Sequence, residues 1–179
     1  MQTVLTAARA GKRSLYVDTE GSFRPERLEE MAMARGWEMK GVLERIVYVR
    51  TDSSSEQMET VRLMAARPTT ASCGLVVIDT LTRNFSVELP GRSNLPARQA
   101  ALNIHLSEMA RDAYLNGRAY LLTNRVTFGP THDVSIGGRT VEQLVDASVL
   151  LEKNEGRVRA TLMPRGGSVQ TQTTTSGVE

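Results

Sequence analysis

Carboxylate and hydroxyl side chains follow two predicted strands of this chain. Asp18 and Glu20 come at the end of one strand, and Asp79 and Thr80 end another. A carboxylate in such a place can hold Mg²⁺ through water, and a second one can position and deprotonate an attacking water molecule. The pattern therefore predicts metal-assisted hydrolysis of a phosphoryl group, with Asp79 on the metal side and Glu20 as the general base.

A structural interpretation of the same residues stays open. An acidic residue at a strand end can simply cap the turn that follows. Asp18 and Glu20 are close neighbours, and the sequence does not decide which of them is structural.

The phosphate-binding half of such a site does not appear in the 179 residues. No segment matches G-x-x-x-x-G-K-[ST], whose backbone N–H groups and lysine hold the β- and γ-phosphates. The Gly11-Lys12 pair is followed by Arg13, and Thr6 stands where the motif needs its first glycine. The sequence thus carries half of an ATPase site.

Strands and helices alternate along the chain, which predicts an α/β fold with a mostly parallel sheet flanked by helices. The predicted strands of this sheet cover residues 13–18, 46–50, 74–79 and 118–123. Helices are predicted at 2–9, from Pro25, from Ser53 with a capping box to Glu56, and over 96–116. Loops are predicted at 83–95 and 127–138, and closing antiparallel strands at 149–152, 158–163 and 168–173.

The predicted sheet would bring the chemical groups together. Ligands of open α/β sheets lie beyond the C-terminal ends of the strands. Glu20, Asp79 and Asn124 are therefore expected to share one crevice.

Length and composition limit the number of domains and the class of protein. A chain of 179 residues with 40% hydrophobic residues fits a single domain over 1–179. The net charge of +2 neither requires nor excludes nucleic acid. Cys73 is the only cysteine, and no apolar run approaches the length of a membrane span. We therefore expect a cytoplasmic protein without membrane contact.

Several segments together resemble the archaeal and eukaryotic RecA-like recombinases, the RadA and RadB group. Residues 16–28 resemble the group's D-T-E-G-x-F-x-P-E-R signature, 75–82 its Walker B strand, and 122–126 its T-N-Q-V segment. Residues 91–99 resemble its first DNA-facing loop with the helix after it, and 136–138 the glycines that close its second DNA-binding loop. The order matches from about residue 11 onward.

The resemblance implies a RecA-like P-loop NTPase core that binds ATP and Mg²⁺. Glu20 corresponds to the water-activating glutamate, and Asp79 to the Walker B aspartate that holds Mg²⁺ through water. Arg27 corresponds to an arginine that packs on the adenine ring. The other implied nucleotide contacts are Thr80, Asn124 and Arg125. The implied contacts to single-stranded DNA are Arg92, Arg98, Gly137 and Gly138.

The chain also departs from the group's pattern. The strand that precedes the phosphate loop lies inside the sheet in this fold, and a sheet lacking it would expose backbone donors and acceptors. We therefore expect an N-terminally incomplete core rather than a natural stand-alone domain. Arg125 replaces a glutamine thought to sense the γ-phosphate. The short 127–138 loop has Phe128 as its only aromatic residue, which weakens the case for full strand exchange.

Two functions follow from these expectations. The first is DNA repair and homologous recombination by ATP-dependent binding of single-stranded DNA. We expect DNA-dependent ATPase activity only if a phosphate loop is supplied, and we expect this chain alone to be inactive. The alternative is a non-hydrolysing accessory paralogue that binds DNA or a recombinase. A weaker third candidate is a RecA-like signalling ATPase. Self-assembly into an oligomer is compatible with the first two.

Overall fold

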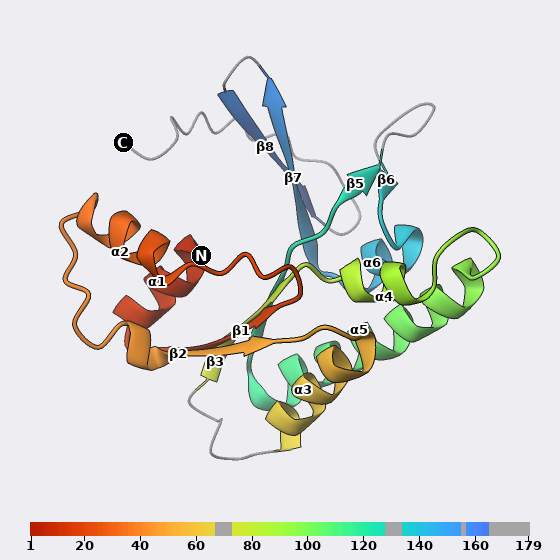
Figure 1. Ribbon diagram of the computed structural model, residues 1–179, viewed down its shortest axis with the longest axis horizontal. Coiled ribbons are helices and arrows are strands. Elements are labelled where there is room, and N and C mark those ends of the chain that lie inside the picture. Colours follow the sequence, from red (N-terminus) through yellow and green to blue (C-terminus); the bar gives the residue numbers. More distant parts are fainter. Residues whose placement is uncertain (67–72, 128–133, 155–156, 165–179) are drawn as a thin grey trace.

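The computed structural model describes residues 1–66, 73–127, 134–154 and 157–164. Its centre is a four-stranded parallel sheet in the order β2-β1-β3-β4 (Figure 1). These strands are β1 (Arg13–Asp18), β2 (Ile46–Arg50), β3 (Cys73–Asp79) and β4 (Ala119–Leu122). The predicted α/β fold with a parallel sheet is confirmed, with strand boundaries within a residue or two of those expected.

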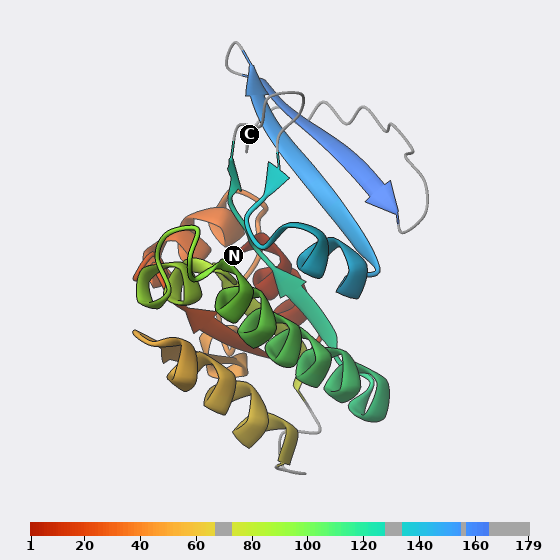
Figure 2. The same cartoon turned by 90° about the vertical axis from the view of Figure 1, so that its right-hand side faces the viewer.

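Helices cover both faces of this sheet. One face carries α1 (Gln2–Arg9) and α2 (Pro25–Met33); the short 3₁₀ turn η1 (Leu43–Arg45) leads from this layer into β2. The other face carries α3 (Ser54–Ala66) and α5 (Leu95–Asn116), which Figure 2 shows side by side. Both faces of β3 are therefore covered, which explains why its central residues are all apolar and buried.

The alternation of side chains along β1 divides the core between the two layers. Leu15 and Val17 pack with buried residues of α3 and α5, such as Val61 and Leu106. Tyr16 points to the other face, where Val4 of α1 is buried with it. The period of two in a strand thus places an aromatic hydroxyl group under the α1 layer.

The C-terminal part forms a separate antiparallel hairpin, as expected. Its strands are β7 (Ala147–Asn154) and β8 (Arg157–Pro164), and Figure 1 shows the hairpin extending away from the parallel sheet. The third closing strand predicted at 168–173 lies outside the described residues.

Both loop predictions were wrong in part. Residues 83–95 contain α4 (Arg83–Glu88), a six-residue helix whose N-cap residue, Thr82, makes no capping hydrogen bond with its side chain. Residues 127–138 contribute to a short antiparallel pair, β5 (Val126–Thr127) and β6 (Val134–Ser135). An unpredicted helix, α6 (Gly138–Leu144), begins at the last residue of the predicted loop, after Ile136 and Gly137.

Within the described residues, we find no helix that combines the length and the apolar character needed to span a bilayer.

Candidate active site

Asp18 is the structural member of the first carboxylate pair. It is fully buried, and its two oxygens accept backbone N–H groups from Glu20, Gly21 and Phe23 at 2.7–3.0 Å. A charged carboxylate that accepts several N–H groups fixes the backbone around it. The turn that it holds carries Glu20 to the edge of the sheet, so the sequence's open choice is settled for Asp18 as the structural residue, and the role of Glu20 as the general base stays a prediction.

A pair of hydroxyl-mediated contacts joins this turn to the end of β3. The Thr19 hydroxyl donates to the Thr80 carbonyl at 3.0 Å and accepts the Thr80 N–H at 2.8 Å. The Thr80 hydroxyl in turn donates to Glu20 Oε1 at 2.9 Å. Thr80 thus fixes the side chain of Glu20 beside the end of β3, in the position that the strand-end rule predicts.

Arg125 forms an ion pair with the same oxygen of Glu20. Its Nη2 lies 2.6 Å from Glu20 Oε1, and the Arg125 side chain is 63% exposed whereas that of Glu20 is 25% exposed. Arg125 follows β4 by three residues and is thus supplied by a different strand end. The pair is open to solvent on the arginine side, so an incoming anion can compete with Glu20 for the guanidinium group.

Asp79 ends β3 with both carboxylate oxygens engaged. The hydroxyl of Tyr16 donates to Oδ2, and the hydroxyl of Thr123 donates to Oδ1. Burial, and then the hydrogen bond to Asp79, raise the pKa of Tyr16 above its ordinary value, so this hydroxyl remains a donor at neutral pH. Asp79 is half-buried, and its carboxylate is held in one orientation by two neighbouring strands.

Asn124 joins the site to the segment that follows. Its Oδ1 accepts from the Thr82 hydroxyl at 2.7 Å, and its Nδ2 donates to the Ile136 carbonyl at 2.7 Å. Gly137 comes next with φ of +93°, and a Cβ there would lie 2.7 Å from Cγ2 of Val141. Glycine is therefore required at 137, and Asn124 links the β4 end to the start of α6.

The predicted DNA-facing arginines occupy different environments. Arg92 is exposed in the turn between α4 and α5, after Gly91 with φ of +79°. Arg98 lies on α5, where its Nη1 donates to the Leu89 carbonyl at 2.9 Å and its buried Nε finds no partner among the described residues. Arg98 thus holds the loop that presents Arg92. Gly138, the second predicted glycine, has φ of +52° with open space beside it.

Arg27 lies away from these contacts. It is on the exposed side of α2, and its Nη1 is 3.6 Å from Glu30 of the same helix. With its side chain 60% exposed, it is accessible to a flat ring, but no described contact joins it to Glu20 or Asp79. Its adenine role stays a prediction.

A buried polar network of α3, α4 and α5 side chains contacts the segments that follow the strand ends. Gln57 of α3 donates through Nε2 to the Leu81 carbonyl at 3.0 Å, and the same Nε2 lies 3.3 Å from Nε2 of His105 on α5. Asn84 of α4 donates to the carbonyls of Thr51 and Ser53. Burial lowers the pKa of His105 to about 4, so the imidazole is neutral at pH 7 and takes part in this network as a structural group.

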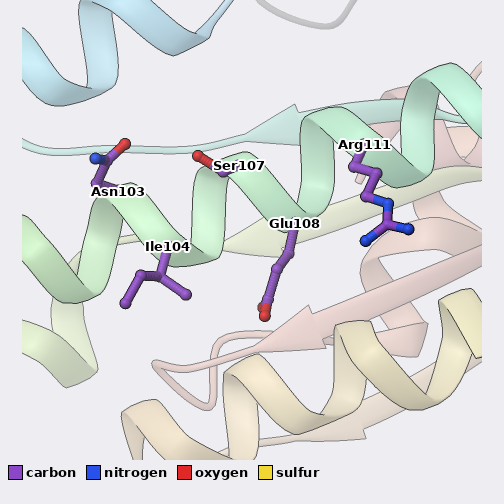
Figure 3. Close-up of a pocket in the computed structure, with 5 residues that line it drawn as sticks. All are labelled: Asn103, Ile104, Ser107, Glu108 and Arg111. Carbon is purple, nitrogen blue, oxygen red and sulfur yellow. The ribbon is translucent and has the colours of Figure 1, made fainter.

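A cavity elsewhere does not belong to this site. Five α5 residues line a shallow hollow of about 340 Å³ on the outer surface of the helix (Figure 3): Asn103, Ile104, Ser107, Glu108 and Arg111. Glu108 points toward α3, where it accepts from Arg62 at 2.9 Å. None of the strand-end residues lines this hollow.

Sequence reasoning missed two contributors. The sequence indicates Thr19 only as part of a motif, although its hydroxyl joins the two strand ends. It indicates Tyr16 only as a strand residue, although its hydroxyl donates to Asp79. A polar ring in the middle of a buried apolar strand was the available signal for Tyr16, since a buried hydroxyl needs a partner.

The fold is an α/β core with a parallel sheet flanked by helices, and comparison with known proteins specifies the family. A family profile described as Rad51 matches residues 2–170. The chain is 36% identical to the DNA repair and recombination protein RadA of Metallosphaera sedula over 157 residues, which is 84% of this chain and 48% of the relative. The chain belongs to the Rad51 family.

Two further relatives agree. They are the RadA proteins of Ignicoccus hospitalis and Aeropyrum pernix, both described as DNA repair and recombination proteins and each 35% identical over 154 residues. The alignments cover 82% of this chain in both cases, and 46% and 48% of the relatives. The chain thus spans about half the length of the curated relatives it matches.

Proposed function

We propose that this chain acts in DNA repair and homologous recombination in the cytoplasm, and that its strand-end residues form the metal and water side of an ATP site coupled to single-stranded DNA binding. The observation that carries the proposal is the contact between the two strand ends. Thr19 and Thr80 join them through two hydrogen bonds, and this contact sets Glu20 beside the end of β3.

Asp79 fits the needs of a magnesium ion. Each of its oxygens accepts one described hydrogen bond, from Tyr16 or Thr123, and each carboxylate oxygen has two lone pairs. A free lone pair on each oxygen can accept a metal-bound water molecule, which suits an ion that keeps several waters and takes few protein carboxylates. Bound Mg²⁺ would neutralise charge on the phosphoryl group.

Glu20 is proposed as the general base. Its Oε1 already accepts from Thr80 and Arg125, so Oε2 is the oxygen that can take a proton from water. The γ-phosphate of a bound nucleotide would compete for the exposed guanidinium group of Arg125, because arginine binds phosphate through charge-assisted bonds. Thr80, Asn124 and Arg27 are the remaining proposed nucleotide contacts.

The phosphate cradle itself has to come from residues other than these 179, because no segment here has the Gly-rich loop and lysine. On this proposal the chain alone turns over no ATP. Self-assembly, or assembly with a recombinase, is part of the proposal.

On the DNA side, Arg92 is proposed as the phosphate contact. It is exposed at a turn that Arg98 holds in place, so the two arginines have different tasks. Phosphate contacts position a strand without reading its sequence. We expect binding of single-stranded DNA that is insensitive to sequence and sensitive to salt. Gly137 and Gly138 are proposed to let the backbone approach the strand.

The test is a titration of the 179-residue chain with a fluorescent ATP analogue, with and without Mg²⁺ and single-stranded DNA. We expect weak nucleotide binding that requires Mg²⁺ and that Asp79→Asn removes. Asp52→Asn is the control, because Asp52 is an exposed carboxylate paired with Arg50. Nucleotide binding that is equal with and without Mg²⁺ and unaffected by Asp79→Asn would contradict the proposal.

The accessory function remains a second candidate because of the Glu20–Arg125 ion pair, which engages the proposed base. An accessory protein would bind DNA in a salt-sensitive manner and would show no Mg²⁺-dependent nucleotide binding at all. The same titration therefore separates the two.

A further inference from the structure

A basic cavity lies at the opposite end of the sheet from the candidate active site. It measures about 340 Å³, and its charged lining residues are Arg9, Glu38, Lys40 and Arg45 around the indole ring of Trp37. Arg9 ends α1 just before β1 begins, whereas Glu20 follows the end of β1. Six strand residues span roughly 20 Å, so the cavity and Glu20 are at distant places.

The ring of Trp37 organises the cations. The guanidinium carbon of Arg9 lies 4.3 Å from the ring centroid, and that of Arg35 lies 5.6 Å from it. The ring itself packs against the buried cluster between α1 and α2, and its backbone N–H donates to the Ala32 carbonyl at 2.9 Å. A rigid aromatic surface thus keeps two like charges close together.

The positive charge of this cavity is not compensated within the described part of the chain. No described ion pair includes Arg9, Lys40 or Arg45, and Glu38 is the sole carboxylate in the lining. Arg45 donates instead to the Gly41 carbonyl at 2.8 Å. By contrast, Arg27, Arg50 and Arg62 each have a carboxylate within 4.0 Å.

Like charges held near one another repel, and an anion placed among them removes the repulsion. Guanidinium groups match phosphate oxygens in geometry as well as charge. The three cations come from different segments, namely the end of α1, the α2–η1 connection and η1 itself. Such a distribution suits a polyanion that passes over the cavity better than one small ion.

We propose that this cavity is a second nucleic-acid contact, which binds phosphate groups of a DNA strand at a place separate from Arg92. The choice of DNA as the polyanion rests on the proposed function, whereas the phosphate chemistry rests on the cavity alone. Lys40 and Arg45 supply the contacts to phosphate, and Trp37 and Arg9 form the base of the site.

The experiment uses Trp37, the only tryptophan of the chain, as the reporter. Its emission is followed while the full chain is titrated with single-stranded oligothymidylate, at several salt concentrations. Separate titrations use inorganic phosphate and polyglutamate. The variant is Lys40→Gln with Arg45→Gln; the matched control is Arg62→Gln with Arg111→Gln, which removes the same charge from α3 and α5.

We expect DNA to change the Trp37 emission of the unaltered chain. Each phosphate contact to a single strand contributes about 0.7 to the slope of log K against log salt. The Lys40/Arg45 double variant should therefore lower that slope by about 1.4, and the control should leave it unchanged. An equal slope in variant and control, with constant Trp37 emission, overturns the inference.

Each remaining outcome either supports or overturns the proposed DNA contact at this cavity. If inorganic phosphate saturates the change in Trp37 emission and DNA adds no further change, the cavity is a site for free phosphate and the inference is overturned. If polyglutamate binds more tightly than DNA, the cavity is a site for acidic peptides and the inference is also overturned. An Arg92→Gln variant separates the two proposals. DNA binding that needs Arg92 but not Lys40 or Arg45 refutes the inference alone. The reverse pattern supports it and refutes the role of Arg92, and no DNA binding refutes both.

Discussion

Replacing Asp18 by asparagine tests the division of labour between the two neighbouring carboxylates. Asp18 is fully buried, and Oδ1 accepts the N–H groups of Glu20 and Gly21. Oδ2 accepts the Phe23 N–H at 3.0 Å and the Tyr48 hydroxyl at 3.3 Å. The substitution keeps the shape of the side chain and replaces one acceptor by a donor.

The expected loss of stability follows from these contacts. In one orientation the new NH₂ group faces the Phe23 N–H, and in the other it faces the N–H groups of Glu20 and Gly21. Either way a charge-assisted bond worth about 1.5–3 kcal/mol is lost and a buried donor remains unsatisfied. We expect the free energy of unfolding to fall by about 3 kcal/mol, which lowers the melting temperature by about 6–12 °C in a chain of this size.

The assay is thermal unfolding followed by circular dichroism, with Glu20→Gln as the matched variant. Glu20→Gln gives up the ion pair to Arg125, whose side chain is 63% exposed, and retains an acceptor for Thr80. An exposed pair contributes less than about 1 kcal/mol. Glu20→Gln should therefore leave the melting temperature within a few degrees of the unaltered chain.

The reasoning is refuted if Asp18→Asn has the same melting temperature as the unaltered chain, or if Glu20→Gln has the lower melting temperature of the two variants. Either result would mean that Asp18 does not hold the turn, and the proposal of Glu20 as the general base would lose its support.

Two further predictions concern the parts around the site. His105 has a folded-state pKa of about 4, below its ordinary 6.5, so the folded chain binds fewer protons and stability falls as the pH drops from 6.5 toward 4. Urea unfolding at several pH values should show that the free energy of unfolding falls by up to about 3 kcal/mol over this range, and that His105→Gln lacks this fall. An equal fall in both chains would show that carboxylates alone cause it. Gly137→Ala should cost about 1–3 kcal/mol, because its Cβ would meet Val141 at a positive φ, whereas Gly138→Ala, with open space beside it, should cost about 1 kcal/mol. Melting temperatures compare the two, and an equal effect would mean that the Val141 contact plays no part.

The parallel sheet was predictable from the sequence because local pattern and tertiary context agree there. Residues 13–18 and 46–50 were predicted as strands with the boundaries that the structure shows. The two α-helices that sequence reasoning missed, α4 and α6, are six and seven residues long and have no side-chain capping hydrogen bond. Tertiary contacts stabilise such short helices, since isolated helices of that length are marginal.

The candidate site was predictable in its location but not in its detail. Strand-end position alone brings Glu20, Asp79 and Asn124 to one edge. The distinct task of Asp18, by contrast, depends on which N–H groups converge on its carboxylate, and no spacing rule supplies that. Arg98 shows the same limit, because its hydrogen bond to the Leu89 carbonyl depends on how α4 and α5 meet.

The ion pair between Glu20 and Arg125 also has a consequence for synthesis of the protein. Its partners are 105 residues apart, and Thr19 and Thr80 are 61 apart. At about 5–20 residues per second, the ribosome adds the stretch from Glu20 to Arg125 in roughly 5–20 s, far longer than a loop or helix needs to form. During that interval Glu20 can pair with Thr80 but not with Arg125, and the candidate site is complete only when the residues that follow β4 have left the ribosome.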